Sequence, residues 1–482
     1  MSRDRQSGAL RRQRRVGIMP ISKLFAAAED HDRIVAFGAD HSHSWLAFRR
    51  DVGHLTERLR ASGGRRFLVV SDDAYAFAVA LLAVLHAGAE AVIPASYQSA
   101  HLTDVSKTVD ALVIHGNAGA DHARWLPILI AGATEDQPPL APLDPDNARI
   151  VLHTSGTSGA GIAVNKPLRC FETEVETLEA LFGGPNLHSV LATVLPHHIY
   201  GLLFRILWPL SAGRPFATTT IGSPNALMAA LATARGPVLI SSPAFMKRAL
   251  TVLDLAALRG LLARVFSSAG PLLPNVAVAY NRALAAPVIE VYGSTETGGI
   301  GYRSVLQTSE PVPWTPMPNV GVRREASGGL LIVRSPHLAE RNWVATGDRG
   351  SLTPGGRFLL ERRADRITKI EGKRVSLTEI EVRLEACPEV SSVRVVALTE
   401  AGRETLGAAV VPSFRGWTKL RESGKRALKD DLLQVLRPYL DAVVLPRRWR
   451  FVRRLPEDAQ GKTNLAAVAM LFAPDQGRIC SP

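Results

Sequence analysis

Residues 151-VLHTSGTSGAG-161 are the stretch from which the fold can first be predicted. An apolar run typical of a β-strand ends at His153, and a polar loop follows. That loop consists of Thr154, Ser155, Gly156, Thr157, Ser158 and Gly159. Its glycines let successive backbone N–H groups converge on an anion, and its hydroxyls donate further hydrogen bonds. We therefore predict a phosphate-binding loop, with a flexible turn as the alternative, although the Walker A pattern is not matched.

Short β-rich runs alternate with helical patterns on both sides of this loop. Strands are predicted at residues 67–70, 150–152, 190–195, 238–240 and 288–292, and helices at 75–86 and 171–182. Such alternation favours a layered α/β fold.

The pattern changes near Glu361. A charged stretch leads into a helix that begins at Ser376, with Glu379 completing a capping box. Strand-like runs at 393–398 and 406–411 and a helix at 425–436 follow. We therefore predict a disordered basic arm at residues 1–16, a large domain at 17–363 and a small mobile α+β domain at 364–482.

Composition excludes several classes of protein. The 482 residues, 46% of them apolar, suffice for two or three domains. The three cysteines, Cys170, Cys387 and Cys480, are too scattered for a disulfide framework or a zinc knuckle, so a reducing cytoplasm is expected. The apolar run at residues 76–89 is too short to span a membrane. The basic arm lacks the apolar stretch of a secretory signal.

The net charge is +13, and the first fifteen residues contribute +5 of it. A second basic cluster lies at residues 447–454, where arginines interleave with Trp449 and Phe451. It is interpreted as a solvated edge strand, or as a surface that attracts phosphates or an acidic partner protein. Nucleic-acid binding is the weaker alternative, because no helix-turn-helix, RNP or zinc-finger pattern accompanies the charge.

A second candidate site is 288-VIEVYGSTETGG-299, where a β-run again ends in a polar loop. Open α/β sheets place their ligands at such strand ends. Glu296 offers a hard oxygen ligand for Mg²⁺, Thr295 a hydroxyl for phosphate and Tyr292 an aromatic face for a purine. The alternative is that Tyr292 belongs to the core and Glu296 to a solvated turn.

Three further motifs follow. In 343-WVATGDRGSL-352, Asp348 could accept from two vicinal ribose hydroxyls, although an aspartate between glycines is usually a turn former. The others are 361-ERRADRITKIEGKR-374 and Gln460-Gly461-Lys462, and neither is diagnostic alone.

In this order and spacing, the five motifs resemble the adenylate-forming superfamily of acyl-CoA synthetases, luciferases and peptide-synthetase adenylation domains. The segments 44-SWLAFRRDVGHLTERLRASG-63 and 79-VALLAVLHAGAEAVIPAS-96 are also similar to early segments of that family, so the resemblance covers nearly the whole chain. It implies a large layered α/β N-terminal domain and a small α+β C-terminal domain that rotates about a hinge.

The resemblance also implies roles for single residues. The loop from Thr154 to Gly159 would hold the β- and γ-phosphates of ATP. Thr295 would bind the α-phosphate and Glu296 Mg²⁺. Adenine and ribose would be bound by Tyr292, Gly293, Ala269, Gly270, Asp348 and Arg363.

For the small domain, the resemblance makes Asp365 the hinge and Lys462 the group that bridges the carboxylate and the α-phosphate. Mg²⁺ and Lys462 would neutralise charge as the carboxylate attacks the α-phosphorus. Rotation would then withdraw Lys462 and bring Gly372 beside the pantetheine tunnel of coenzyme A or of an acyl carrier protein.

Two segments bear on which carboxylic acid is the substrate. The segment 196-PHHIYGLLF-204 resembles the family's acyl-pocket entrance, with His198 at the reacting centre and residues 201–209 lining or supporting it; a core histidine is the alternative. His197 and His198 stand where peptide-synthetase domains carry an aspartate, which disfavours an amino acid. In 267-SSAGPL-272, Ser268 and Ala269 replace glycines and would narrow the wall beside adenine and acyl group.

Two departures from the family pattern stand out. Gly161, Ile162 and Ala163 replace Pro-Lys-Gly after the phosphate loop, which leaves Lys166 as the nearest cation. Glu457 stands where a basic residue is usual. These changes motivate the alternative of a catalytically weak adenylate-binding or scaffold protein.

The sequence therefore predicts a cytoplasmic, Mg·ATP-dependent acid–thiol ligase with a small carboxylic acid as substrate. Coenzyme A or the phosphopantetheine of an acidic acyl carrier protein would be the acceptor. Chains with the HHIYGLLFRxLWPL pattern look like ligases of aryl polyene or lipid biosynthesis, which favours an aryl or unsaturated acid. Neither a nucleic-acid partner nor a membrane span is expected.

Overall fold

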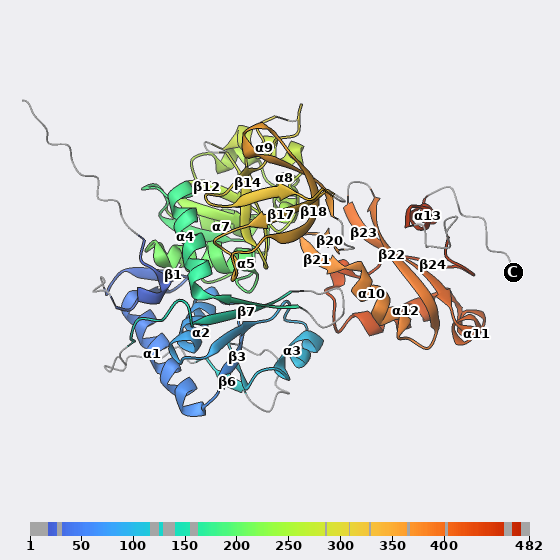
Figure 1. Ribbon diagram of the computed structural model, residues 1–482, viewed down its shortest axis with the longest axis horizontal. Helices are drawn as coiled ribbons and strands as arrows, with labels where there is room; N and C mark the ends of the chain where they lie inside the picture. Colours follow the sequence, from blue (N-terminus) through green and yellow to red (C-terminus); the bar gives the residue numbers. More distant parts are fainter. Residues whose placement is uncertain are drawn as a thin grey trace, which may run out of the picture.

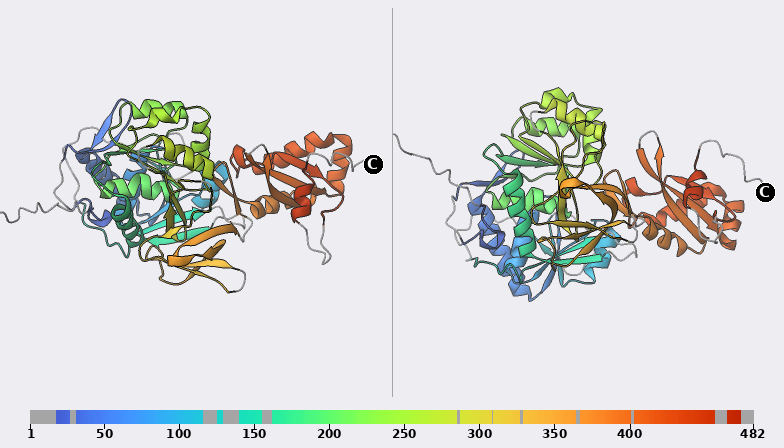
Figure 2. Two further views of the ribbon diagram at one scale, coloured as in Figure 1. Left: turned by 90° about the horizontal axis from the view of Figure 1, so that it is seen from above. Right: turned by 45° about the horizontal axis from the view of Figure 1, so that its top comes forward.

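The computed structural model describes residues 18–26, 31–115, 125–128, 140–154, 162–284, 287–307, 309–326, 329–363, 367–400, 403–456 and 465–473. They form a large N-terminal body and a small C-terminal one, seen as two lobes in Figures 1 and 2. The predicted α/β class, with a large N-terminal domain and a smaller C-terminal one, is confirmed. Residues 1–16 and 364–366 lie outside the described ranges, so the basic arm and the boundary at 363/364 stay predictions.

The first sheet of the large domain has six strands in the order β6-β5-β3-β4-β7-β8. They are β3 (Arg66–Val70), β4 (Glu90–Ile93), β5 (Ala111–Ile114), β6 (Trp125–Pro127), β7 (Arg149–Thr154) and β8 (Ile162–Pro167). All neighbours are parallel except β7 and β8, which pair antiparallel. In the chain, the predicted phosphate loop therefore connects the inner strand β7 to the edge strand β8.

The second sheet has nine strands in the order β15-β14-β13-β12-β11-β9-β10-β1-β2. They are β1 (Ile34–Phe37), β2 (Ser42–Ser44), β9 (Ser189–Ala192), β10 (Phe216–Ala217), β11 (Pro237–Ser241), β12 (Arg264–Ser267), β13 (Ile289–Ser294), β14 (Gly298–Arg303) and β15 (Thr315–Pro316). The inner strands from β1 to β13 are parallel. β9 ends three residues earlier than predicted, because the Val194 carbonyl accepts from the buried Arg205 guanidinium at 2.9 Å.

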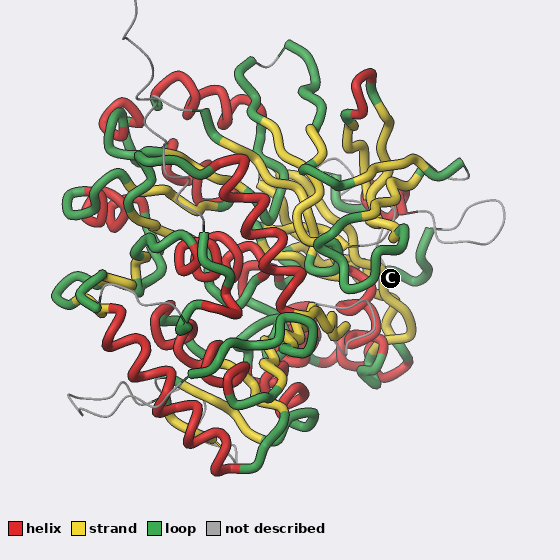
Figure 3. The backbone as a smooth tube through the Cα atoms, turned by 60° about the vertical axis from the view of Figure 1, so that its left-hand side comes forward, coloured by secondary structure: helices red, strands yellow, loops and turns green. Residues whose placement is uncertain are grey.

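Helices surround and separate these sheets, whose strands run through the middle of the molecule (Figure 3). They are α1 (Trp45–Ser62), α2 (Ala74–His86), α3 (Ser99–Ser106), α4 (Leu168–Phe182), α5 (Ile199–Gly201), α6 (Trp208–Ser211), α7 (Pro224–Leu231), α8 (Pro243–Leu250) and α9 (Pro274–Ala283). Short 3₁₀ turns are η1 (Ile21–Lys23), η3 (Leu255–Leu258) and η4 (Pro354–Gly356), and η2 (Leu202–Leu207) is π-helical.

Helix α2 lies between the two sheets. It packs against β3 and β4 of the six-stranded sheet and against η2, which follows β9 of the other sheet. Every residue of α2 is buried, because its sequence is apolar on all sides. Asp73 caps its N-terminus by accepting from the Ala76 N–H at 2.8 Å. The helix therefore fixes the two sheets relative to each other.

A four-stranded antiparallel sheet completes the large domain. Its order is β16-β17-β18-β19, with β16 (Gly321–Arg324), β17 (Leu330–Arg334), β18 (Val344–Leu352) and β19 (Phe358–Arg363). In the small domain, β20 (Ile367–Ile370) and β21 (Lys373–Ser376) form a hairpin, and β22 (Val390–Glu400), β23 (Arg403–Pro412) and β24 (Arg448–Phe451) form a sheet. Its helices are α10 (Leu377–Glu385), α11 (Phe414–Glu422), α12 (Gly424–Leu436) and α13 (Leu465–Met470), with the 3₁₀ turn η5 (Ala442–Val444).

Two predictions for the small domain can be compared with this structure. The Ser376 side chain caps α10 by accepting from the Glu379 N–H at 3.1 Å. The reciprocal half of the capping box is not seen, because the Glu379 carboxylate binds Arg383 at 3.0 Å instead. The basic cluster includes β24, which is an edge strand paired with β23 alone. Among the described residues, no helix is long and apolar enough to cross a membrane.

A test of this packing is Gly201→Ala. A Cβ at Gly201 would lie 2.0 Å from the Leu195 carbonyl oxygen, so the turn before η2 has no room for one. We expect the free energy of unfolding in urea to fall by about 2 kcal/mol. Gly222→Ala is the control, because a Cβ there meets nothing within 4 Å. Equal stability of the two variants would contradict the account.

Candidate functional site

A cavity of about 890 Å³ lies where the carboxyl ends of the strands in the large domain meet the β20–β21 hairpin. Parallel sheets place their ligands at this edge. Many of the predicted site residues line it, although they come from distant parts of the chain. These are Thr154, His198, Ala269, Gly270, Tyr292, Gly293, Thr295, Asp348 and Gly372.

The remaining predicted residues are placed differently. Residues 155–159, Asp365 and Lys462 lie outside the described ranges. Arg363 pairs with Asp348 across β18 and β19, but its side chain is likewise not described. Glu296 follows the cavity-lining Thr295 and is not itself among the lining residues.

In the part of the cavity that is predicted to bind the nucleotide, a hydrogen bond joins two of the predicted motifs. The Tyr292 hydroxyl donates to Asp348 Oδ2 at 2.7 Å. The Tyr292 ring lies 5.6 Å from the Trp314 ring and 5.9 Å from the Phe358 ring. Thr346 accepts from the Asp348 N–H at 3.1 Å, which holds the turn. The arrangement leaves an aromatic ring and a carboxylate oxygen side by side in the cavity wall, which suits a purine nucleoside.

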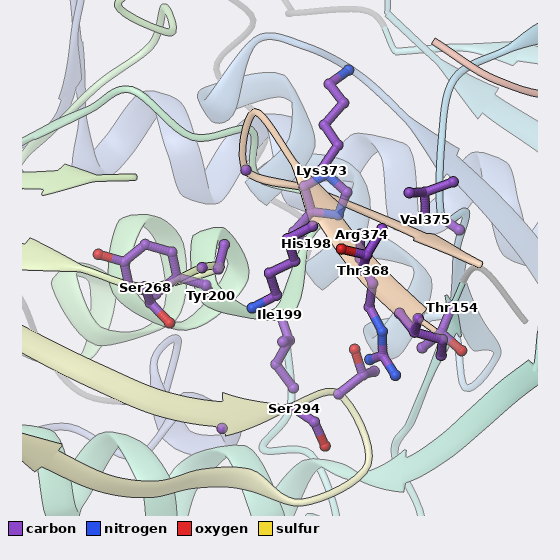
Figure 4. Close-up of a pocket in the computed structure, with 18 of the residues that line it drawn as sticks. Thr154, His198, Ile199, Tyr200, Ser268, Ser294, Thr368, Lys373, Arg374 and Val375 are labelled. Atoms are coloured by element: carbon purple, nitrogen blue, oxygen red, sulfur yellow. The ribbon is translucent and has the colours of Figure 1, made fainter. Parts of the chain in front are cut away.

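The wall next to Tyr292 is formed by the loop after β12. Ala269 has a φ of +67°, a backbone conformation that favours glycine. The Ser268 hydroxyl donates to the Val291 carbonyl at 2.8 Å. Ser268 lies beside Tyr200 in Figure 4. Two non-glycine residues thus form this wall, and one of them adopts a strained backbone.

Histidines and tyrosines form the opposite end of the cavity. The His197 ring lies 4.1 Å from the Tyr97 ring and 4.2 Å from the His198 ring. The Tyr97 hydroxyl donates to the Ser71 carbonyl at 3.0 Å, which fixes the ring. The His198 side chain is exposed to the cavity, and the residues that line the cavity surround it. This enclosure governs its protonation: burial, with Lys373 adding to the effect, lowers the pKa of His198 to about 4.

The segment after His198 supports the cavity from behind. Residues 202–208 are buried in the core and do not line the cavity, whereas residues 197–200 do. Arg205 is fully buried and donates to backbone carbonyls at the ends of β9 and β10, including Thr218 at 2.9 Å. The sequence did not identify this role.

The β20–β21 hairpin forms the small domain's side of the cavity. Thr368, Arg374 and Val375 lie between His198 and Thr154 in Figure 4. Gly372 has a φ of +83°, and a Cβ there would lie 3.6 Å from Ala244. β24 and α13, which flank residues 457–464 in the chain, lie on the far side of the small domain (Figure 1).

A contact between the domains forms part of the cavity lining. Gln98 of the large domain donates to Asp441 Oδ1 at 2.8 Å, and Lys373 forms an ion pair with Asp441 Oδ2 at 2.5 Å. The His101 and Tyr439 rings meet edge to face at 6.2 Å. Of these residues only Lys373 belongs to a motif, the one at residues 361–374, so the sequence could not indicate the others.

Lys166, the cation nearest to the phosphate loop in sequence, is buried. Its Nζ lies 3.2 Å from the Thr295 carbonyl oxygen. It therefore holds the second loop and does not line the cavity.

Comparison with known proteins identifies the family. The AMP-binding enzyme family model matches residues 24–327, and the AMP-binding enzyme C-terminal domain model matches residues 379–462. The chain belongs to the AMP-binding enzyme family. The resemblance stated from the motifs is thereby confirmed.

Curated relatives of this AMP-binding enzyme are CoA ligases. A 4-coumarate–CoA ligase of Rhodobacter capsulatus is 28% identical over 66% of this chain and 75% of its own length. A 3-hydroxybenzoate/4-hydroxybenzoate–CoA ligase of Thauera aromatica is 27% identical over 66% of this chain and 65% of its own length. The structure of the amide bond synthetase McbA from Marinactinospora thermotolerans matches with a TM-score of 0.78 and 22% identity, covering 91% of this chain and 97% of that one. This last likeness shows the shared fold.

A first test of the site is Tyr292→Phe. The ring would remain, but Asp348 would lose the hydroxyl that orients it. We expect the affinity for ATP, measured by calorimetry, to fall by up to about tenfold. Tyr302→Phe is the control, because this ring lies outside the cavity lining and packs on Phe182. Unchanged affinity in Tyr292→Phe would contradict the assigned geometry.

A second test concerns pH. Because the pKa of His198 is lowered to about 4, its ring is neutral at pH 7 and gains a proton only as the pH falls toward that value. Between about pH 5.5 and 8, the pH profile of thioester formation should keep its shape in His198→Gln, whatever the change in rate. An ionisation near 6.5 that disappears in the variant would show that His198 titrates normally.

Proposed function

We propose that this protein uses Mg·ATP to convert a carboxylic acid into an acyl adenylate and then transfers the acyl group to a thiol. The observation that carries the proposal is one cavity lined by Thr154, Thr295 and the Tyr292–Asp348 pair at one end and by His198 at the other. Its size suits a ligand of this kind, and it reaches from the predicted phosphate loop to the β20–β21 hairpin.

In the first half-reaction, a carboxylate oxygen attacks the α-phosphorus and pyrophosphate leaves. Tyr292 offers its ring to adenine and Asp348 accepts from the ribose hydroxyls. The Thr295 hydroxyl donates to the α-phosphate, and Lys462 neutralises the charge that develops there. In the second half-reaction, a thiolate attacks the acyl carbonyl and AMP leaves.

Mg²⁺ would be held by Glu296 together with phosphate oxygens and water. A single carboxylate fits this ion, because Mg²⁺ in nucleotide sites takes one or two protein carboxylates and completes its octahedron with phosphate and water. The described residues contain no group of three or more His, Cys, Asp or Glu side chains that could hold a metal without a nucleotide. Bound there, Mg²⁺ would screen the triphosphate from the approaching carboxylate.

For the acid we propose an aryl or unsaturated substrate. The cavity lining at the acyl end includes the aromatic side chains of Tyr97, His197, His198 and Tyr200, and the first three rings contact one another at tilted angles. Flat conjugated groups pack well on such rings. The curated relatives include 4-coumarate–CoA and hydroxybenzoate–CoA ligases, which supports the same class.

For the acceptor we propose coenzyme A or the phosphopantetheine arm of a carrier protein. A second cavity of about 700 Å³ shares Leu195, Lys373 and Glu404 with the first. Its lining also includes three arginines, namely Arg248, Arg403 and Arg447. These cations suit the phosphates that both acceptors carry.

The deciding experiment is acid-dependent ATP–pyrophosphate exchange by the full chain with aryl, unsaturated and saturated acids. Exchange with at least one acid, followed by thioester formation with coenzyme A or a carrier protein, is expected. ATP binding without exchange for any acid would contradict the proposal and favour the adenylate-binding scaffold, which the altered phosphate loop motivates.

Lys462→Ala separates the half-reactions. We expect adenylation to fall by about a hundredfold or more, because the developing charge loses its counterion. Thioester formation from supplied acyl adenylate should stay within about threefold, because the lysine acts only in the first step. Lys425→Ala, on an exposed face of α12, is the control. Equal loss in both half-reactions would contradict the assigned role.

A further inference from the structure

Lys166 is a buried charge beside the nucleotide site that no motif explains. It lies on β8, the strand that leaves the phosphate loop, and its side chain is 1% exposed. Its Nζ lies 3.2 Å from the Thr295 carbonyl oxygen and 3.3 Å from that of Glu296. Burying an ammonium is costly unless hydrogen bonds replace its water. The ammonium therefore donates its hydrogen bonds to the backbone of Thr295 and Glu296, the two residues that would bind the α-phosphate and Mg²⁺.

The same turn is held from a second side. Glu174 of α4, which is 2% exposed, accepts from the Gly299 N–H at 2.6 Å. The Nδ1 of His337 lies 3.0 Å from the Gly299 carbonyl oxygen. A Cβ at Gly298 would lie 2.5 Å from the Glu174 carboxylate, so the turn rests directly on it. Buried groups of opposite charge on β8 and α4 thus fix both ends of residues 295–299.

The side chains of Glu174, Cys170 and Glu296 surround the Lys166 ammonium. Burial lowers the pKa of Lys166, and the neighbouring Glu174 opposes that effect. Two carbonyl acceptors favour the protonated form further. The Phe171 ring lies 5.8 Å from Nζ. A lysine bound in this way fixes two consecutive peptide groups at once.

We propose that Lys166 is a positioning residue for Mg·ATP, and this rests on the proposed function. By fixing the carbonyls of Thr295 and Glu296, it sets where the Thr295 hydroxyl and the Glu296 carboxylate meet the triphosphate. Lys166 thereby links β8, the strand that follows the phosphate loop in the chain, to the loop at Thr295 and Glu296. It does this from outside the cavity, without touching a phosphate.

The test compares the binding of Mg·ATP and of adenosine to the full chain by calorimetry. Lys166→Met keeps the length of the side chain and removes its charge. We expect it to weaken Mg·ATP binding by about tenfold or more, as loss of groups that orient metal ligands does elsewhere. Adenosine binding should change by less than about twofold, because Tyr292 and Asp348 are untouched.

The matched control is Arg214→Met. Arg214 forms an ion pair at 2.6 Å with Glu179, which lies on α4 as Glu174 does. It also donates to the Leu187 carbonyl, which lies outside residues 295–299. Both variants should unfold at a lower temperature than the parent, but Arg214→Met should bind Mg·ATP as the parent does. If Lys166→Met does not fold, Lys166→Met/Glu174→Gln removes both buried charges and takes its place.

Parental affinity for Mg·ATP in the lysine variant, or equal loss for Mg·ATP and adenosine, would overturn the positioning role. A parent that binds Mg·ATP yet exchanges pyrophosphate with no acid would refute the proposed function alone, since the binding comparison still decides the role of Lys166. A parent that does not bind Mg·ATP would refute both.

Discussion

The candidate site depends on one hydrogen bond, that from Tyr292 to Asp348 at 2.7 Å. Tyr292 lies on β13 of the nine-stranded sheet, and Asp348 lies on β18 of the four-stranded sheet. The bond therefore ties two sheets together at the cavity wall. A ring and a carboxylate in fixed relation provide a stacking surface and a hydrogen-bond acceptor side by side. The phosphate loop then needs only to lie within reach of the same nucleotide.

The positions of the loops follow from how the sheets are built. Parallel strands of both sheets direct their carboxyl ends toward one region. The buried helix α2 packs between the sheets and fixes their relative position. The small domain adds the β20–β21 hairpin to that region, while β24 and α13 lie on its far side. We interpret this arrangement as the one suited to thiol transfer, because Gly372 is at the cavity.

Much of this could be predicted from sequence, because motifs report on local chemistry. Tyr292, Asp348 and Thr154 are predicted from the loops that carry them and Gly372 from the family resemblance, and all four line the cavity. What the sequence could not show are contacts between distant segments. The bond between Gln98 and Asp441 joins residues 343 positions apart, and neither residue stands out locally.

The role of Lys166 could not be predicted either, because it depends on a contact between distant segments. Its place in the sequence suggested a spare cation near phosphate, yet β8 becomes buried at its last two residues, Lys166 and Pro167. Only the tertiary contact with Thr295 and Glu296 explains a buried charge at that position. Arg205 is similar, because a buried arginine that binds carbonyls has no local signature.

The most direct measurement is a crystal structure of the full chain with a non-hydrolysable acyl-adenylate analogue. The account predicts adenine against the Tyr292 ring, ribose hydroxyls on Asp348, phosphate mimic at Thr295 and acyl group toward His198. An analogue bound outside this cavity, or bound in it without contact to Tyr292 and Asp348, would contradict it.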